Sequence, residues 1–272
     1  MPELPEVETT RRGIAPLVTG KTIARVVVRV PSLRWPVPAD LARTLVGQTV
    51  LAVERRAKYL LLRCSGGHLI IHLGMTGHLR PVLAGAPARK HDHIDLEFTD
   101  GSCLRFHDPR RFGAFLWTPD DPHLHPLLVE LGPEPFAVEM DGAYLHRRSR
   151  RRRAAVKPFI MDQSVVVGIG NIYASEALFR AGIHPGAEAG RLSLPRYERL
   201  AWAIREVLDQ AIAAGGTTIR DFANTEGNPG YFALQLQVYG REGETCPHCD
   251  RPIKTERLGG RSTYYCSHCQ KK

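Results

Sequence analysis

The sequence predicts an α+β protein in which a strand-rich first half is followed by a helical second half and a short cysteine-rich segment. Three observations predict this. Over residues 21–118, short runs rich in β-branched and aromatic residues alternate with turn signals, which is typical of an antiparallel sandwich or barrel. After a proline-rich stretch ending near 132–137, apolar residues recur with helical spacing. Near the C-terminus, four cysteines form two close pairs.

The first half begins with a predicted helix. From Pro5 to Leu17 the apolar residues share one face, a proline is tolerated in a first turn, and Gly20 ends the pattern. The step Asp100-Gly101 is a strong hairpin signal between two β-rich runs. The predicted strand regions are 21–30, 49–64, 68–80, 93–100, 103–108 and 113–118.

The second half has helical periodicity and one long loop. The last predicted helix carries its apolar residues on one face, and Gly215-Gly216 end it. Residues 216–231 are rich in glycine and polar residues and too long for a simple connector, which indicates a functional or disordered loop. The predicted helices are 139–150, 154–162, 171–181 and 194–214.

The chain is basic, with 272 residues and a formal net charge of +9. An excess of this size favours a polyanionic partner such as nucleic acid, although a charge run is more often a solvated face. The cations concentrate in RRSRRRR at 147–153 and near the C-terminus. No apolar run reaches the length of a membrane span and the acidic N-terminus is no signal peptide, so we expect a soluble, cytoplasmic protein.

The cysteine pattern C-x2-C-x16-C-x2-C predicts one structural Zn(II), because two such pairs can place four thiolates around one ion and leave no open position. The alternatives are disulfides and free thiols, and a cytosolic location disfavours the disulfides. His248 and His268 are alternative ligands, while Cys64 and Cys103 lie in β-runs as small core residues. The predicted ligands are Cys246, Cys249, Cys266 and Cys269.

The first residues, MPELPEVETT, carry chemistry of their own. Removal of Met1 would turn Pro2 into a terminal secondary amine, which is a nucleophile. The pKa of an α-amino group is about 8, against about 10.4 for lysine, so a usable fraction is neutral at physiological pH. The alternative is a frayed, solvated terminus, which is where most chain ends lie.

Taken together, the motifs make the whole chain resemble the bacterial formamidopyrimidine-DNA glycosylase (Fpg or MutM) family, whose members remove oxidised purines from DNA. The resemblance implies an N-terminal helix with a two-layered antiparallel β-sandwich over 1–132. It also implies a helical domain with a helix–two-turn–helix element over 133–236 and a four-cysteine zinc finger over 237–272. The motifs that carry it are MPELPEVE, LGMTGHLR, KHDHIDL, DPRRFG, KPFIMD, VVVGIGNIYASEALFRAGIHP, NPGYF and the cysteine pairs.

The resemblance also implies catalytic residues. Pro2 matches the nucleophile that forms a Schiff base, and Glu3 matches the acid/base residue that protonates the sugar oxygen. Lys58 matches an acid in β-elimination, and Arg261, near the tip of the cysteine-bearing hairpin, matches a phosphate grip used in δ-elimination. Glu6 is expected to support this site. From the residues alone, Lys58 would be a solvated strand lysine and Glu6 a stabilising carboxylate in a first helical turn.

Damage recognition takes the nucleotide out of the stack, and something must fill the space that it leaves. Met75, Arg110 and Phe112 match the filling residues of the family, with Arg110 directed at the orphaned cytosine. From the residues alone, Met75 and Phe112 would belong to the core. The loop at 217–231 matches the segment that closes over the everted base.

Other matched positions are expected to contact the DNA backbone. Asn171 lies at a predicted helix start, where it is either a plain N-cap or a phosphate ligand. Glu176 is expected to orient the N-terminal strand, with a surface carboxylate as the alternative. The remaining backbone-contacting positions are His72, His91, Arg152 and Lys157.

These features predict a monomeric bacterial enzyme, associated with the nucleoid through DNA, that excises 8-oxoguanine and formamidopyrimidines and then cleaves the abasic strand by β,δ-elimination. Two alternatives stay open. An endonuclease VIII-like relative would share Pro2 and Glu3 but prefer oxidised pyrimidines. A non-catalytic zinc-finger protein would bind DNA alone, although intact Pro2, Glu3 and Lys58 speak against it.

Overall fold

A computed structural model describes residues 1–216 and 236–272. Among these residues the chain forms two compact units, which are described separately. The first comprises Met1–Val129 with 214–216, and the second comprises Glu130–Ala213 with 236–272. The loop expected at 217–231 to close over an everted base lies outside the described residues.

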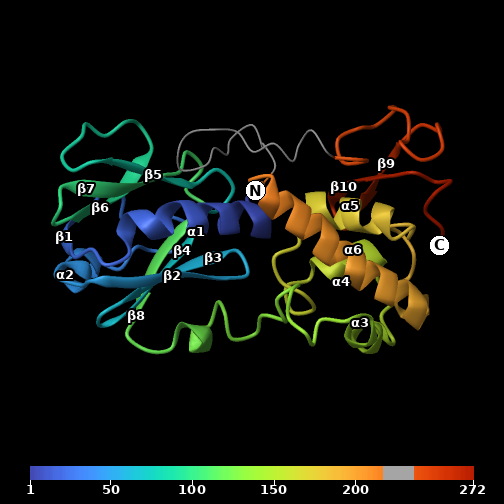
Figure 1. The fold of residues 1–272 in the computed structure, drawn as a ribbon, viewed down its shortest axis with the longest axis horizontal. Coiled ribbons are helices and arrows are strands. Elements are labelled where there is room, and N and C mark those ends of the chain that lie inside the picture. Colours follow the sequence, from blue (N-terminus) through green and yellow to red (C-terminus); the bar gives the residue numbers. More distant parts are fainter. Residues whose placement is uncertain (217–235) are drawn as a thin grey trace. The chain divides into compact units, whose positions relative to one another are not determined.

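The first unit is a β-sandwich with two helices (Figure 1). The helices are α1 (Leu4–Val18) and α2 (Leu41–Leu45), and the strands are β1 (Ile23–Val28), β2 (Val50–Arg56), β3 (Tyr59–Cys64), β4 (Gly67–His72), β5 (His78–Leu83), β6 (Asp92–Phe98), β7 (Ser102–His107) and β8 (Ala114–Thr118). One sheet has the order β1-β6-β7-β5 and the other β2-β3-β4-β8, with every pairing antiparallel. The predicted α+β class and two-layered sandwich are confirmed.

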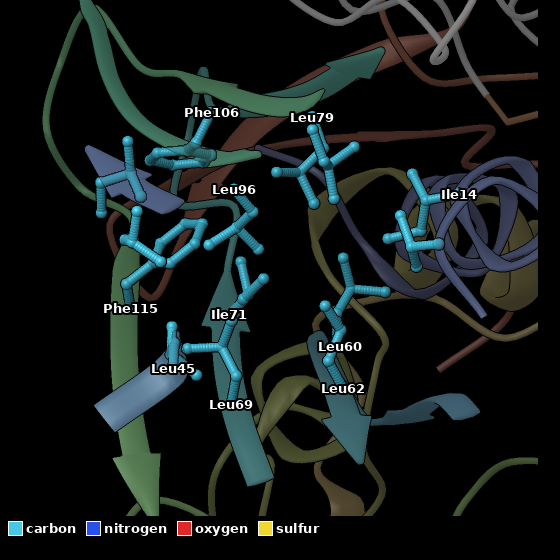
Figure 2. Packing of buried hydrophobic residues seen from close by; sticks show 14 of the residues in the cluster. Ile14, Leu45, Leu60, Leu62, Leu69, Ile71, Leu79, Leu96, Phe106 and Phe115 are labelled. Atoms are coloured by element: carbon cyan, nitrogen blue, oxygen red, sulfur yellow. The ribbon is translucent and has the colours of Figure 1, made fainter. Parts of the chain in front are cut away.

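The two sheets enclose one hydrophobic core (Figure 2). Leu96 and Phe106 from one sheet face Leu60 and Ile71 from the other, and Ile14 of α1 joins the same cluster. All five side chains are almost fully buried. Since burying one such side chain stabilises a fold by about 1.5–3 kcal/mol, this packing attaches α1 firmly to the sandwich.

Two of the predicted strand regions each divide into two strands. The region 49–64 turns at Ala57-Lys58, where Ala57 has a φ of 54°, and the region 68–80 is interrupted by the loop 73–77. The hairpin at Asp100-Gly101 is confirmed, with Gly101 at a φ of 82°. Helix α2 was not predicted because five residues are too few to show helical periodicity.

The second unit contains the remaining helices and the hairpin of the cysteine segment (Figure 1). Helix α6 packs against α3 and α5, and α5 also contacts β10. None of the helices in the described parts of the chain combines the length and apolar character that crossing a bilayer requires. The elements are α3 (Gly142–Ser149), α4 (Val156–Met161), α5 (Asn171–Arg180), α6 (Leu194–Ala213), β9 (Lys254–Leu258) and β10 (Arg261–Tyr265).

A buried ion pair links β6 and β7 and holds the loop between β5 and β6. The guanidinium of Arg105, which is 1% exposed, donates to both carboxylate oxygens of Asp95 at 2.7 and 2.8 Å. It also donates to the carbonyl oxygens of Ala86 at 2.7 Å and Pro87 at 3.0 Å. The pair thereby fixes the loop that leads to His91.

Replacing Arg105 should therefore destabilise the first unit. Arg105→Met leaves the buried Asp95 carboxylate with one fewer cationic partner, and breaking a buried pair in this way lowers the free energy of unfolding by about 3–5 kcal/mol. Urea denaturation followed by circular dichroism measures this loss. Arg25→Met is the control, because Arg25 is exposed and lies 3.8 Å from Glu97, so little change is expected. Equal small losses in both variants would contradict the role of Arg105.

Candidate functional site

The N-terminal residues are buried rather than frayed. Pro2, Glu3 and Glu6 are all buried, and α1 begins directly after Glu3, which is its N-cap. The Glu6 carboxylate accepts a hydrogen bond from the backbone N–H of Glu3 at 2.8 Å. Both carboxylates therefore lie at the positive end of the helix dipole, where negative charge is favoured. The predicted first-turn role of Glu6 is confirmed by this contact.

Glu6 also contacts the residue at which the first described segment ends. A Cβ atom on Gly216 would lie 3.0 Å from Oε1 of Glu6, and Gly216 has a φ of +84°. Both the close approach and the left-handed backbone favour glycine at this position. Gly216 therefore lies directly beside the Glu6 carboxylate.

Lys58 occupies the turn between β2 and β3 and is only 7% exposed. The interpretation of Lys58 as a solvated strand lysine is therefore wrong: the two-residue turn places it outside the strand, and packing buries it. The left-handed conformation of Ala57 is uncommon for a residue with a Cβ atom and sets the direction of this turn.

His72 is held neutral by its surroundings. Burial, followed by the charges of Lys58 and Arg34, lowers the pKa of His72 to about 4. Its Nδ1 accepts a hydrogen bond from the backbone N–H of Gly74 at 3.0 Å, so in the neutral ring the proton is on Nε2. A neutral His72 has one N–H donor, and the backbone of Phe112 is a hydrogen-bond partner of the ring.

Asp108, which the sequence analysis did not single out, connects the two loops that carry the filling residues. One of its carboxylate oxygens accepts from the hydroxyl of Thr76 at 2.7 Å and the other from the backbone N–H of Gly113 at 2.8 Å. The hydroxyl of Thr76 accepts in turn from the backbone N–H of Arg110 at 3.3 Å. The available signal was the aspartate that opens DPRRFG, a residue type that commonly organises turns.

The three residues that are predicted to fill the space of an everted nucleotide lie on these connected loops. Met75 is half-buried, Arg110 is exposed, and the Arg110 guanidinium lies 5.0 Å from the centre of the Phe112 ring. Phe112 is 41% exposed, so its interpretation as a core residue is wrong. His91, on the neighbouring loop, is half-exposed with a φ of 73°. An exposed aromatic ring beside a guanidinium is suited to contact with bases.

Three of the predicted backbone-contacting residues belong to the second unit. Asn171 is the first residue of α5 and Gly170 is the N-cap, so the interpretation of Asn171 as a plain N-cap is wrong. Its amide Nδ2 donates to the carbonyl oxygen of Ser262 at 3.0 Å, and its Oδ1 accepts from Lys157 at 2.6 Å. Lys157 is buried, whereas Arg152 is exposed. Arg261, which was predicted to be catalytic, is also exposed, at the start of β10.

Glu176 has a different role from the one that the sequence suggested. Its carboxylate accepts hydrogen bonds from three consecutive backbone N–H groups, those of Gln237, Val238 and Tyr239, at 2.8–3.0 Å. Burial nevertheless raises the pKa of Glu176 above its ordinary value. The alternative of an exposed surface carboxylate is therefore wrong, since Glu176 is 4% exposed. Within the second unit, Glu176 anchors the chain that leads to the cysteine segment.

The four predicted zinc ligands form one cluster. Their sulfur atoms all lie within 4.8 Å of one another, with 3.9 Å between Cys246 and Cys269 and 3.5 Å between Cys249 and Cys266. A tetrahedron with a Zn–S distance of ~2.3 Å has sulfur atoms about 3.8 Å apart, so the donor set fits zinc. Cys246 and Cys266 also pack against Phe179 of α5, which attaches the cluster to the helical part of the unit.

Comparison with known families decides the identity of the chain. The profile of the formamidopyrimidine-DNA glycosylase N-terminal domain matches residues 1–115, and that of the formamidopyrimidine-DNA glycosylase H2TH domain matches 131–223. The chain belongs to the formamidopyrimidine-DNA glycosylase family. A third profile, the zinc finger found in FPG and IleRS, matches residues 243–272. The cysteine cluster of this glycosylase is therefore a structural zinc site.

Individual relatives agree over their full length. Formamidopyrimidine-DNA glycosylases from Alkalilimnicola ehrlichii and Syntrophotalea carbinolica are each 60% identical, with all of both chains covered. The crystal structure of MutM (Fpg) from Thermus thermophilus is 40% identical with a TM-score of 0.89, covering 99% of this chain and 98% of that one. Lactococcus lactis Fpg in complex with DNA containing an abasic site is 34% identical with a TM-score of 0.90, covering 99% and 100%.

Replacing one ligand should release the metal and loosen the finger. Cys249→Ser leaves three thiolates, so we expect zinc content to fall from one ion per chain to well below one in a chelator-treated sample. DNA affinity should fall with it, while the sandwich keeps its near-ultraviolet circular dichroism. Metal analysis and fluorescence anisotropy measure the two effects. Cys64→Ser is the control, because Cys64 belongs to β3 of the first unit and is not a member of the cysteine cluster. Full zinc content in Cys249→Ser would contradict the ligand assignment.

Proposed function

We propose that this chain excises oxidised purines from duplex DNA and cleaves the resulting abasic strand, with Pro2 as the nucleophile. One observation carries the assignment: Pro2 and Glu3 are both buried at the start of α1, not frayed. Membership of the glycosylase family supports it, as do solved complexes of the Lactococcus lactis relative with DNA containing an abasic site or Fapy-dG.

The first step joins the enzyme to the sugar. With Met1 removed, the neutral nitrogen of Pro2 attacks C1′ of the damaged nucleotide and forms a C–N bond, while the bond from C1′ to the base breaks and the base leaves with its electron pair. The proton that the Pro2 nitrogen then loses neutralises the departing base. Glu3 donates a proton to the ring oxygen as the sugar opens, which produces the iminium between Pro2 and C1′. The iminium is the electron sink for the next step.

Strand cleavage follows by two eliminations. Loss of a proton from C2′ sends electrons toward the iminium and expels the 3′ phosphate, and a second elimination expels the 5′ phosphate. We assign the acid in the first elimination to Lys58, which lies close enough to His72 for its charge to lower the pKa of that ring. We assign the phosphate grip in the second to Arg261. Zinc takes no part in these steps, because four thiolates leave it no open position.

The duplex is held by groups of different kinds. We propose that Arg152 and His91 contact the DNA backbone, that His72 donates from its neutral ring, and that Asn171 binds a phosphate at the N-terminus of α5. This helix has ten residues, and its first backbone N–H groups add to the attraction for an anion.

Met75, Arg110 and Phe112 fill the space left by the everted nucleotide. The hydrogen bonds of Asp108 support this assignment, because they hold both loops in one arrangement. Phe112 then enters the base stack as a flat ring, and Arg110 donates to the acceptors of the unpaired cytosine.

We further propose that the functional divisions of the chain are 1–132, 133–236 and 237–272. The enzyme would act as a monomer in the bacterial cytoplasm, associated with the nucleoid through its DNA substrate. Its bacterial relatives and the basic surface support this proposal.

The nucleophile can be identified by trapping. Borohydride reduces the iminium on a duplex with 8-oxoguanine opposite cytosine, and mass spectrometry of the digest should place the adduct on the peptide that begins with Pro2. A variant that retains Met1 should trap poorly, since the Pro2 nitrogen is then an amide. An adduct on the Lys58 peptide would assign the attack to Lys58 instead.

Glu3→Gln should separate the two activities. The amide keeps the size of the side chain but cannot donate the proton, so base excision should fall about 10²–10⁴-fold. Cleavage of a preformed abasic site should fall less, because the sugar there is already an open aldehyde. Single-turnover assays on the two substrates measure both rates. Equal losses on both would contradict the assigned role.

Arg110 should set the dependence on the opposite base. Its guanidinium can pair with the edge of cytosine but not equivalently with that of adenine, so 8-oxoguanine opposite adenine should be excised poorly. Arg110→Ala should reduce this discrimination by about 1–3 kcal/mol in kcat/KM, the usual contribution of a good base contact. Arg111→Ala is a matched control, since Arg111 is the exposed neighbour. Identical discrimination in Arg110→Ala and the parent would refute the role.

A further inference from the structure

Lys157 is a cation buried inside the second unit, where three elements meet. Its side chain is attached to α4 and is 1% exposed. The ammonium Nζ donates to Oδ1 of Asn171 at 2.6 Å, to the hydroxyl of Thr263 at 2.8 Å and to the carbonyl oxygen of Ser262 at 3.1 Å. One acceptor belongs to the start of α5 and the other two belong to β10 of the zinc finger.

These three bonds account for all of the donors of the group. A lysine ammonium has three N–H donors and no acceptor, and here each donor has a protein oxygen within hydrogen-bonding distance. Burying a cation is costly unless its donors are satisfied, so this cluster is a built arrangement. Lys157 in this state has no proton left for a phosphate, which differs from its expected role as a contact to the DNA backbone.

The same bonds fix the direction of the Asn171 amide. Because Lys157 donates to Oδ1, the amide oxygen must face the ammonium, and Nδ2 donates to the carbonyl oxygen of Ser262 at 3.0 Å. Within residues 1–216 and 236–272, this is the one bond of Nδ2, so its second N–H can serve an external acceptor. The amide therefore presents a donor rather than an acceptor at the start of α5, as binding of a phosphate requires.

The cluster also reaches Arg261. The hydroxyl of Thr263, which accepts from Lys157, donates to the carbonyl oxygen of Arg261 at 3.2 Å. Arg261 itself is exposed at the beginning of β10, directly after the Gly259-Gly260 turn. A chain of hydrogen bonds thus runs from Lys157 through Thr263 to the backbone that carries the Arg261 guanidinium.

We propose that Lys157 is a positioning residue, which locks Asn171 and the Arg261 turn into one rigid arrangement for gripping adjacent phosphates, and that it does not itself bind DNA. The proposal rests on the proposed function in one respect, namely that Asn171 and Arg261 contact DNA. In physical terms, the finger holds its arginine in place before DNA arrives, so that less conformational entropy is lost on binding.

The test uses Thr263, which is 0% exposed and cannot touch DNA. Thr263→Val removes the hydroxyl with nearly unchanged volume and leaves Lys157 in place. In the zinc-loaded protein without DNA, the backbone amides of 261–265 should exchange with deuterium at least about tenfold faster. Affinity for a duplex containing a tetrahydrofuran abasic analogue should fall about tenfold, the result of losing roughly 1.4 kcal/mol. Thr263→Ser keeps the hydroxyl and should behave like the parent.

Either of two results with Thr263→Val would overturn the proposal. The first is unchanged exchange of 261–265 in Thr263→Val. The second is that Thr263→Val binds the duplex as tightly as the parent although Arg261→Ala binds it more weakly. This outcome would mean that the Thr263 hydroxyl does not position Arg261, and it would fit a Lys157 that binds phosphate directly. If Arg261→Ala and Asn171→Ala both leave affinity unchanged, the proposed function fails at these residues, and the exchange measurement still decides whether the cluster holds the hairpin. Lys157→Met gives a second reading of exchange, in which accelerated 261–265 amides are expected and unchanged ones contradict the proposal.

Discussion

A chain terminus ordinarily frays, because ordering its first residues costs conformational entropy that few contacts repay. Chemistry at the second residue requires the opposite. Here α1 begins at Leu4 and buries Val7, Ile14 and Val18 in the core of the sandwich, so the helix is fixed along its length. Pro2 and Glu3 are held because they continue directly into that helix. The sandwich core is thus what gives Pro2 and Glu3 a defined position.

The exposed site residues of the first unit depend on buried polar groups beneath them. Asp108 ties the loop of Met75 to the loop of Phe112, and Gly74 allows the backbones of the two loops to approach because it has no side chain. Arg105 holds the loop that leads to His91 by donating to the carbonyl oxygens of Ala86 and Pro87. In each case a charged side chain satisfied inside the fold holds an outward residue in place.

In the second unit, two kinds of bond hold the finger. Zinc closes the cysteine cluster, which packs on Phe179 of α5. Hydrogen bonds from Lys157 of α4 hold β10 of the hairpin and the start of α5. Glu176 adds a third attachment where the chain enters the finger, through the backbone N–H groups of 237–239. A hairpin of twelve residues, 254–265, has too small a core to be rigid by itself, so these attachments determine the direction of Arg261.

Local patterns in the sequence were enough to predict the α+β class, the hairpin at Asp100-Gly101, the helix that ends at Gly215-Gly216 and the four zinc ligands. Each of these depends on the spacing of neighbouring residues, which the sequence states directly. The candidate site residues came from long motifs that resemble one family, and not from periodicity. Residue type alone would place Phe112 in the core and Lys58 on a solvated strand, and both placements are wrong because residue type decides burial only on average.

What only the tertiary structure decided is which distant groups share a hydrogen bond. Lys157 and Thr263 are 106 positions apart, and Thr76 and Asp108 are 32 apart. No local rule connects such residues, because their contact is produced by the packing of whole elements. The sequence by itself determined which chemical groups this protein possesses and the elements that carry them. The tertiary structure determined that Glu176 binds backbone N–H groups, that Asp108 joins two loops, and that Lys157 faces inward, since a buried charge must find its partners wherever the fold places them.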